Sequence, residues 1–360
     1  MAGKHDLWMT GFSLAVLPLM ARAEVMVQRM PQLRQAYNLS PLPPLSIIIP
    51  ARDEEDTLRR LLPSLTAQIY PGELEIIVVD DHSTDETACV AAQLGARVLS
   101  APDLPPGWLG KANAMQHGAS AARGAWLLFT DADTCHNPLS AATAVAYAEA
   151  QDLDGLSIFL EQETSGTLDK AVLMVAFAGL FAGSRPSVPL LNGQYLLLRR
   201  ETLAATGGFS PIKGEMMDDL AYAHVLAEAG LNVPMLRGEE LACVHMYDNT
   251  RELWGGVARL GSGSLSHAGP SGLIPALLIT GVMMPMWALF SDRRKARDNK
   301  ALWLLWAGAL ASFLPWGKRF GSYWLAPLAS IAAMFVQVAS FSGMIARLLG
   351  RGLSWKGRKV

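Results

Sequence analysis

The first half of the chain alternates short apolar runs with segments whose apolar residues recur at helical spacing. Residues 45–49 (LSIII) and 74–79 (LEIIVV) are apolar except at one position each, which is typical of strands buried on both faces. We expect Pro50 to end the first of these strands. An amphipathic helix is predicted between the two runs, because apolar residues recur there at intervals of three and four: Leu58, Leu61, Leu62 and Leu65.

The same alternation continues to about residue 160. Strands are predicted over residues 96–101, 125–133 and 153–160, and helices over residues 83–95, 111–123 and 139–151. Strands that alternate with helices of about 12 residues indicate βαβ units, so the predicted fold class is α/β with a mostly parallel sheet. In such sheets ligands bind at the carboxyl ends of the strands.

Polar residues gather where three of these strands end. Residues 51–55 read ARDEE, Asp80 and Asp81 follow the second strand, and the strand over 125–133 ends in Asp131 and Asp133. Because the carboxyl ends of parallel strands meet at one edge, we expect these side chains to lie near one another. The chain has no dinucleotide fingerprint, phosphate-binding loop or nucleophile elbow.

Asp131 and Asp133 are one residue apart at a strand end, so their carboxylates project close together. Hard oxygen ligands of this kind suit Mg²⁺ or Mn²⁺, which also take phosphate oxygens from a substrate. Such a metal ion neutralises a diphosphate as it leaves. A solvated turn is the alternative interpretation of Asp131 and Asp133, and helix capping is the alternative for Asp80 and Asp81.

Two further charged positions are candidates for the same site. Lys111 begins a predicted helix, where a cation opposes the helix dipole unless an anion binds nearby. Asp218 and Asp219 begin another predicted helix after an apolar stretch. Acids are favoured in a first helical turn, but a carboxylate at that position is also suited to act as a general base.

Composition separates the chain into two parts. The formal net charge is −2 over 360 residues, so nothing suggests a nucleic-acid partner. The three cysteines include no C-x-x-C pair, which favours thiols over a zinc site. Residues 272–290, 301–317 and 322–346 are uncharged, and aromatic residues lie near their ends, so we predict C-terminal membrane helices. Residues 7–21 predict an N-terminal anchor or interfacial helix.

The expected organisation is an N-terminal anchor and linker (1–44), an α/β domain (45–265) and a hydrophobic region with a basic tail (266–360). Basic residues in 291–300 and 347–359 favour the cytosolic side for both segments. With a cytoplasmic α/β domain, the 272–290 segment would lie in the interface or re-enter, and the last two segments would form a hairpin. The hydrophobic segments and the basic residues beside them predict a protein of the cytoplasmic membrane.

Six motifs occur in the order seen in family 2 glycosyltransferases of the GT-A fold, which residues 45–260 therefore resemble. They are SIIIPARDEE, IIVVDDHSTDET, GKANAMQHG, LLFTDADT, NGQYLLLRRETLAATGGF and MMDDLAYAHVLAEAG. The PPGWLGKANA segment and the hydrophobic tail resemble the branch with carotenoid (diaponeurosporenoate-type) and hopene-associated glycosyltransferases. The resemblance implies a GT-A nucleotide-diphospho-sugar transferase fold and an inverting hexosyltransferase.

The resemblance also implies a role for each matching residue. On the donor side it implies nucleotide-sugar contacts at Pro50, Ala51, Arg52, Glu54, Asp80 or Asp81, Lys111 and Asp131. Divalent Mn or Mg would be held by Asp131 and Asp133, with Asp133 as the direct ligand. Asp219 matches the general base of the family's Glu-Asp motif. The residues that border the acceptor would be Gly193, the turn with Gly208, and Asp218.

The sequence departs from the family pattern at several points. His82 replaces the usual glycine, Asp218 replaces the glutamate, and the Gln-x-x-Arg-Trp set of polymer synthases is missing, which favours transfer of one sugar. His245 is interpreted as a packed histidine in preference to a metal or phosphate contact.

The sequence is compatible with three hypotheses. The leading one is a membrane-associated enzyme that moves a sugar from a nucleotide donor, a UDP-sugar above all, to a lipid-like terpenoid, carotenoid or hopanoid acceptor. The second is a polyprenyl-phosphate glycosyltransferase, whose phosphate would meet Arg199, Arg200, Arg251 or Arg259. The third is a non-catalytic membrane protein that binds nucleotide sugars.

Overall fold

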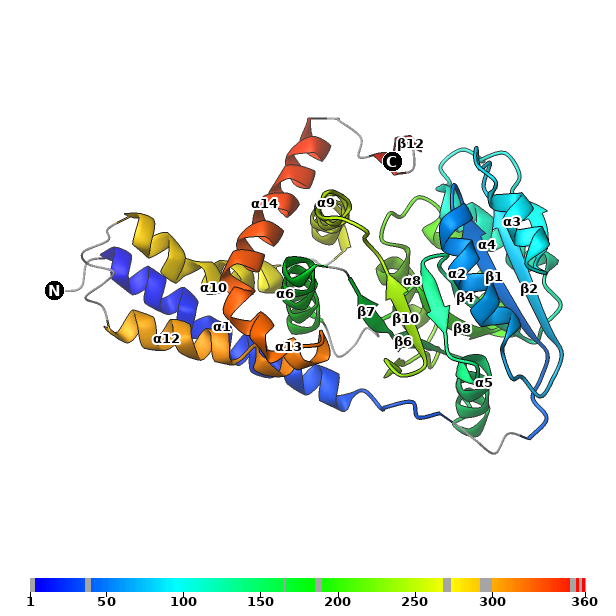
Figure 1. Cartoon of the computed structure of the whole chain (residues 1–360), viewed down its shortest axis with the longest axis horizontal. Coiled ribbons are helices and arrows are strands. Elements are labelled where there is room, and N and C mark those ends of the chain that lie inside the picture. The colour runs from blue at the N-terminus through cyan, green and yellow to red at the C-terminus, as the bar shows by residue number, and fades with distance from the viewer. Residues whose placement is uncertain are drawn as a thin grey trace. The chain divides into compact units, whose positions relative to one another are not determined.

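The computed structural model of the chain describes residues 4–35, 40–164, 166–184, 190–267, 273–291, 300–349, 354–355 and 358–359. The chain forms two compact units. The sheet unit comprises residues 30–162, 186–245 and 354–360, and the helical unit comprises residues 1–29, 163–185 and 246–353. Each unit is described by itself (Figure 1).

The sheet unit is built on a seven-stranded sheet of order β3-β2-β1-β4-β8-β6-β9. β1 pairs in parallel with β2 and β4, β6 pairs in parallel with β9, and β8 is antiparallel to both β4 and β6. The sheet is therefore mostly parallel, as predicted. The strands are β1 (Leu45–Ala51), β2 (Leu74–Asp80), β3 (Arg97–Ser100), β4 (Trp126–Thr130), β6 (Gly155–Phe159), β8 (Tyr195–Arg199) and β9 (Met235–Arg237).

Helices pack on this sheet through the apolar positions that the spacing predicted. In α2 all four leucines of the predicted stripe are fully buried. A second core forms where α4 and α8 cover β1, β4 and β8, and Phe129, Phe209 and Tyr222 meet within it. The helices of this unit are α2 (Glu55–Thr66), α3 (Thr87–Gln93), α4 (Gly110–Ala121), α5 (Ser140–Ala150), α7 (Arg200–Ala205), η1 (Ser210–Ile212) and α8 (Asp218–Glu228).

The prediction that Pro50 ends the first strand is wrong. β1 continues to Ala51, and Pro50 pairs with Val79 of β2. The pairing of β1 with β4 stops at Ile48, so Pro50 has one neighbouring strand instead of two. A proline, which has no N–H to donate, is tolerated in a strand at such a position.

A small second sheet lies beyond β4 and was not predicted. β5 (Thr134–His136) pairs antiparallel with β10 (Ala242–His245), and β7 (Glu161–Glu163) is its third strand. Cys135 and Cys243 face each other in the register of β5 and β10. The partner strands are distant in the sequence, so a local pattern gives no sign of their pairing. This sheet fixes the chain just after Asp133.

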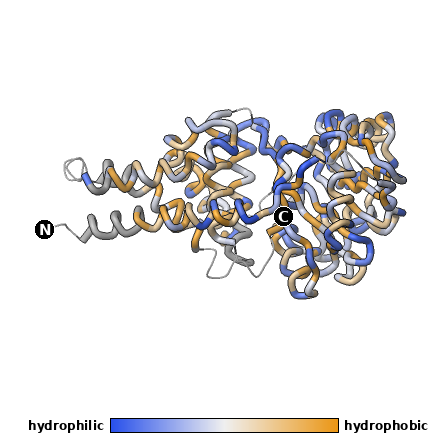
Figure 2. The backbone as a smooth tube through the Cα atoms, turned by 90° about the horizontal axis from the view of Figure 1, so that it is seen from below, coloured by the Kyte–Doolittle hydropathy of each residue, from blue (hydrophilic) through white to orange (hydrophobic). Residues whose placement is uncertain are grey.

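The helical unit contains the hydrophobic segments, and hydrophobic positions recur along its described helices (Figure 2). The predicted continuous span 301–317 is broken into α12 and α13. One described helical stretch, Tyr323–Leu348, is long and apolar enough to cross a membrane. The loop 292–299 lies outside the described residues. The elements are α1 (Lys4–Arg29), α6 (Thr167–Gly183), α9 (Thr250–His267), α10 (Leu273–Ser291), α12 (Lys300–Ala311), α13 (Leu314–Arg319), η3 (Tyr323–Leu328) and α14 (Ala329–Leu348).

Polar contacts connect these apolar helices. The guanidinium of Arg319 donates to both carboxylate oxygens of Glu24 at 2.6 and 2.7 Å and lies over the Trp316 ring. Arg22 donates to the Ala182 carbonyl at the end of α6. In the tail, β11 (Ser354–Trp355) pairs with β12 (Arg358–Lys359).

Candidate functional site

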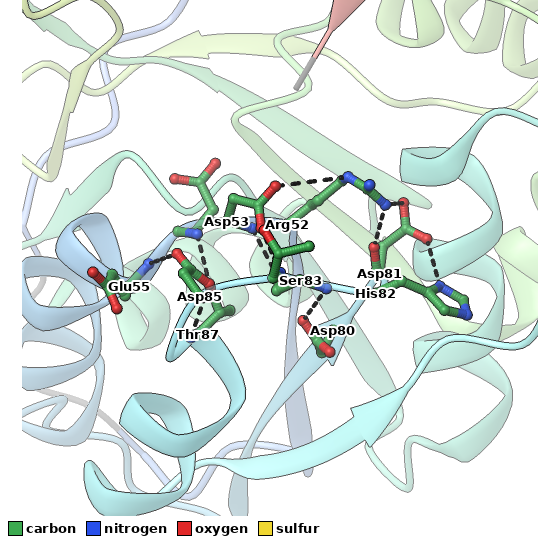
Figure 3. A network of polar contacts seen from close by, with 11 residues as sticks. Arg52, Asp53, Glu55, Asp80, Asp81, His82, Ser83, Asp85 and Thr87 are labelled. Carbon is green, nitrogen blue, oxygen red and sulfur yellow. Dashed lines mark hydrogen bonds and ion pairs between the residues drawn. The ribbon is translucent and has the colours of Figure 1, made fainter. Parts of the chain in front are cut away.

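Hydrogen bonds join the loops that follow β1 and β2 at the carboxyl edge of the sheet (Figure 3). Arg52 Nη1 donates to the Asp81 carbonyl at 2.7 Å, and Asp53 Oδ1 accepts from the Thr84 amide at 2.7 Å. Ser83 Oγ accepts from the Asp53 amide at 3.0 Å. Ser83 and Thr84 are therefore engaged with the β1 loop and do not cap α3, which begins later, at Thr87. The expected meeting of two strand ends is present.

Asp80 and Asp81 have different surroundings. The Asp80 carboxylate accepts from the Ser83 amide at 3.2 Å and closes its own turn. The Asp81 carboxylate is buried and lies 4.0 Å from Arg52 Nη1 and 3.4 Å from His82 Nδ1. Asp81 thus belongs to the polar network between the loops, while Asp80 shapes one loop.

Lys111 is the cation that meets the carboxylates at the end of β4. Its Nζ lies 2.9 Å from Asp131 Oδ1 and 3.2 Å from Asp218 Oδ2. The lysine comes from the first turn of α4 and Asp218 from the first turn of α8, so three elements converge at this point. Burial opposes the charge on Lys111, but the neighbouring carboxylates outweigh it and raise the pKa of the lysine.

Asp219 lies beside this group, against the segment that carries Gly193. A Cβ added to Gly193 would lie 3.5 Å from Asp219 Cβ and 3.6 Å from Lys111 Nζ, which are ordinary van der Waals distances. Gly193 is therefore a near neighbour of both side chains. Burial, followed by the charge of Asp218, raises the pKa of Asp219 to about 6, and Lys111 partly offsets the rise. A carboxylate with such a pKa is ionised at neutral pH and still basic enough to accept a proton.

Asp133 is the least satisfied carboxylate of the site. Its Oδ1 is buried and has no hydrogen-bond partner among the described residues. Burial, together with the charges of Asp131 and Glu54, raises the pKa of Asp133 to about 7. Burial also raises the pKa of Asp131, against the effect of Lys111. The site therefore holds more negative charge than Lys111 balances.

This charge distribution fits a divalent cation. Mg²⁺ and ions like it are commonly bound by one or two carboxylates together with water and substrate phosphates. Among the described residues no cluster of three or more His, Cys, Asp or Glu side chains is placed to enclose a metal ion. Asp133, with Asp131 beside it, offers an open site of the first kind, in which a ligand would supply the remaining oxygens.

Residues 46–204 match the family model described as glycosyl transferase family 2. This segment belongs to that family. The family resemblance and the GT-A fold expected from the motifs are thus confirmed. A mannosyltransferase from Pyrobaculum calidifontis, solved with GDP-Man and Mn²⁺, has a similar fold, with a TM-score of 0.61 at 18% identity over 94% of this chain and 99% of that chain.

Curated relatives resemble parts of the chain. The 4,4'-diaponeurosporenoate glycosyltransferase of Staphylococcus aureus strain USA300 is 31% identical over 215 residues, which are 56% of this chain and 56% of that protein. The enzyme of the same name from strain MRSA252 is 46% identical over 90 residues, which are 25% of this chain and 24% of that protein. The chain thus spans about half the length of these relatives, or less.

The family 2 domain departs from the usual glycine at His82, and the backbone there is left-handed, with a φ of 58°. Glycine adopts this conformation without steric cost, whereas other residues pay roughly 1–2 kcal/mol. His82 retains the loop shape despite that cost, and its ring contacts Asp81. The departure therefore changes a side chain at the site and leaves the turn intact.

Gly208 lies in a turn with a φ of 69° and meets the side chain of Gln116. Gln116 Oε1 accepts from the Phe209 amide at 2.8 Å, and a Cβ on Gly208 would lie 2.2 Å from the same oxygen. Phe209 then lines a small hollow next to Asp218 and Asp219, together with Met115, Phe129, Gly193, Leu196, Ile212 and Tyr222. Gly208 thus precedes a residue that lines this hollow, and its turn sets where the Phe209 backbone meets Gln116.

Sequence reasoning missed how two residues are placed. Glu54, assigned to nucleotide contacts with Pro50, Ala51 and Arg52, also acts electrostatically on Asp131 and Asp133. The amide of His245 donates to the Asp133 carbonyl at 2.9 Å, so this half-buried histidine lies opposite Asp133 across the β5–β10 pair. This contact joins the two backbones only, and it depends on long-range strand pairing.

Proposed function

We propose that the protein transfers a glycosyl group from a nucleotide-diphosphate sugar, a UDP-sugar above all, to a lipid-like acceptor of the carotenoid type. The observation that supports this most is the meeting of Asp131, Lys111 and Asp218 within 3.2 Å at the carboxyl edge of the sheet, next to Asp219 and Asp133. The names of the curated relatives support the acceptor class.

On the donor side, Asp133 and Asp131 would hold Mn²⁺ or Mg²⁺. When bound, the ion supplies positive charge that stabilises the leaving nucleoside diphosphate. Lys111 is within reach of the same region and adds a second positive charge for the phosphates, at the first turn of α4 where backbone N–H groups also favour anions. The loops with Arg52 and Asp81 would receive the nucleoside.

On the acceptor side, Asp219 would accept the proton of an acceptor hydroxyl as the new glycosidic bond forms, with inversion at the anomeric carbon. A pKa of about 6 leaves Asp219 ionised at neutral pH. An acceptor carboxylate, which the relatives' name implies for those enzymes, is already deprotonated at this pH. Asp219→Asn is therefore expected to abolish transfer to hydroxyl acceptors and to impair transfer to carboxylate acceptors less.

The side chains of α14 support the membrane part of the proposal. Apart from Val336, its buried face consists of small residues, such as Ala332, Ala339 and Gly343. Its exposed face is the outer stripe, a set of bulky apolar residues each at least 43% exposed: Ile331, Met334, Val338, Phe341, Ile345 and Leu348. Soluble proteins bury such residues, whereas helices in lipid pack through small residues and turn large ones outward.

The outer stripe is bordered as membrane helices often are. Tyr323 and Trp324 in η3, which directly precedes α14, are 53% and 83% exposed, and Arg347 lies in the last turn of α14. α14 has 20 residues, which span about 30 Å, the thickness of a bilayer core. We infer that α14 inserts in the cytoplasmic membrane, with the family 2 domain on the cytoplasmic side.

The structure gives less support to a polyprenyl-phosphate acceptor. Arg199 and Arg200 lie at the edge of the sheet where β4 begins, opposite the edge with Asp131. Arg199 donates to the Leu153 carbonyl, lies over the Trp126 ring and pairs with Glu149 at 3.0 Å, and Arg200 donates to the Gly124 carbonyl. These two guanidinium groups are engaged in fold contacts, so they do not form a phosphate pocket at the site.

The proposal is tested with the full-length protein in detergent, Mn²⁺, a membrane lipid extract and a panel of UDP- and GDP-sugars. Release of nucleoside diphosphate together with a glycosylated lipid is the expected result. Asp133→Ala should remove both products, and Asp152→Asn, which removes an exposed charge beside Arg199 at the opposite edge of the sheet, is the control. Donor binding without turnover in every combination would favour the non-catalytic alternative, and transfer only to water-soluble acceptors would refute the acceptor class.

A further inference from the structure

A buried polar cluster lies directly beneath the turn that holds the two carboxylates. Its members are Thr130, the last residue of β4, and Thr134 and His136, the first and last residues of β5. Their exposed fractions are 1%, 2% and 4%. The catalytic scheme above uses none of them, and the sequence alone did not single them out.

Hydrogen bonds connect the members of this cluster to one another and to two backbone carbonyls. Thr130 Oγ1 donates to the Gln194 carbonyl at 2.9 Å, and Thr134 Oγ1 donates to the Asp131 carbonyl at 2.8 Å. The two hydroxyl oxygens also lie 2.9 Å apart, and either one can donate to the other. His136 Nε2 lies 3.1 Å from Thr130 Oγ1 and 3.2 Å from Thr134 Oγ1. The imidazole and the two hydroxyls therefore form one connected polar group.

The other ring nitrogen indicates that the ring is neutral. Nδ1 of His136 is buried and has no hydrogen-bond partner among the described residues, so a proton on it would be stranded. Burial lowers the pKa of His136 to about 3, so the ring is neutral, and its one proton belongs on Nε2, where the two hydroxyls accept it. The ring lies beside Tyr195, with the centroids 5.3 Å apart. His136 is thus a fixed single donor.

We propose that Thr130, Thr134 and His136 are positioning residues that hold the Asp131–Asp133 turn in its metal-binding conformation. Thr134 fixes the first carbonyl of the turn, and Thr130 connects the turn to Gln194, the neighbour of Gly193. Because Gly193 lies against Lys111 and Asp219, the cluster joins the donor and acceptor sides through hydrogen bonds that solvent does not reach. The inference rests on the metal site of the proposed function.

The first test measures Mn²⁺ binding to the full-length protein in detergent, without substrates, from the electron paramagnetic resonance signal of free Mn²⁺. Thr134→Val removes the hydroxyl at nearly constant volume, and Thr134→Ser retains it. Loss of such supporting contacts typically weakens metal binding about 10- to 100-fold, which we expect for Thr134→Val, with Thr134→Ser close to wild type. Thr134→Ala takes the place of Thr134→Val if that variant does not fold.

Thr202→Val is the matched control. Thr202 is also 2% exposed, and its hydroxyl donates to the Asp154 carbonyl at the same 2.8 Å, but it has no contact with the turn. A general effect on folding would lower the melting temperature of Thr202→Val and Thr134→Val alike. Only a positioning role would weaken Mn²⁺ binding in Thr134→Val and leave it unchanged in Thr202→Val.

His136 gives an independent comparison. His136→Gln retains an N–H donor and His136→Met does not, so Mn²⁺ binding should be weaker in the methionine variant. Equal Mn²⁺ affinity in wild type, Thr134→Val and His136→Met would overturn the inference, provided that Asp133→Ala loses binding. If Asp133→Ala binds Mn²⁺ as wild type does, the metal site of the proposed function is itself wrong, and the two failures are thereby distinguished.

Discussion

Mn²⁺ binding to this site is expected to weaken about tenfold when the pH falls from about 8 to about 6. Only the ionised carboxylate of Asp133 is a ligand, and burial together with Asp131 and Glu54 raises its pKa to about 7. The ionised fraction then falls from roughly nine-tenths at pH 8 to roughly one-tenth at pH 6. The apparent dissociation constant rises by the same factor, because the metal ion must displace a proton.

The assay is a Mn²⁺ titration of the substrate-free protein across this pH range, followed by the signal of free Mn²⁺. Calorimetry in two buffers of different ionisation enthalpy counts the protons released, about half a proton per metal ion at pH 7. Glu54→Gln removes one cause of the raised pKa, so the midpoint should move to lower pH. An affinity that stays constant from pH 8 to pH 6, or a midpoint unchanged in Glu54→Gln, would refute the reasoning.

Further predictions concern stability, the cation and the membrane. Without metal, the free energy of unfolding should fall as the pH rises from about 4 to about 7, because the pKa of Asp133 in the folded protein lies above the ordinary 3.8. Melting curves without Mn²⁺ should show this loss of stability, and melting curves with Mn²⁺ should show that the metal ion restores it. Gly208→Ala should lower the melting temperature more than Gly207→Ala, because both have positive φ but only the first meets an atom, Gln116 Oε1, within 4 Å. Lys111→Met should lower kcat/KM at least about tenfold by leaving the diphosphate less neutralised, which donor titrations would detect. Phe341→Asp on the outer stripe should release the protein from the membrane fraction, unlike Asp152→Asn.

The local patterns of the sequence predicted most of the sheet unit. Buried strands and amphipathic helices can be recognised from a few neighbouring residues, as the leucines of α2 illustrate, because each element buries a periodic face. The exception at Pro50 has a tertiary cause. Whether a proline ends a strand depends on how many neighbouring strands it must pair with, and that number is set by β2 and β4.

For the site, the sequence by itself determined which residue types stand at the strand ends. The motifs and the alternation of strands and helices place four aspartates at the carboxyl edge of the sheet: Asp80, Asp81, Asp131 and Asp133. It did not determine which charges meet. The contact of Lys111 with both Asp131 and Asp218 joins residues 20 and 107 positions apart, and the burial that raises the pKa of Asp133 exists only after packing.

The sequence likewise determined that the C-terminal segments are apolar. Only the tertiary structure decided which face of α14 points outward. Small and large residues alternate along this helix, and their order does not show which of them the neighbouring helices cover. The Thr130, Thr134 and His136 cluster depends on the tertiary structure in the same way. Its hydrogen bonds to Asp131 and Gln194 form because β4, β5 and β8 exclude water from that point, and a linear pattern of residues does not specify where water is excluded.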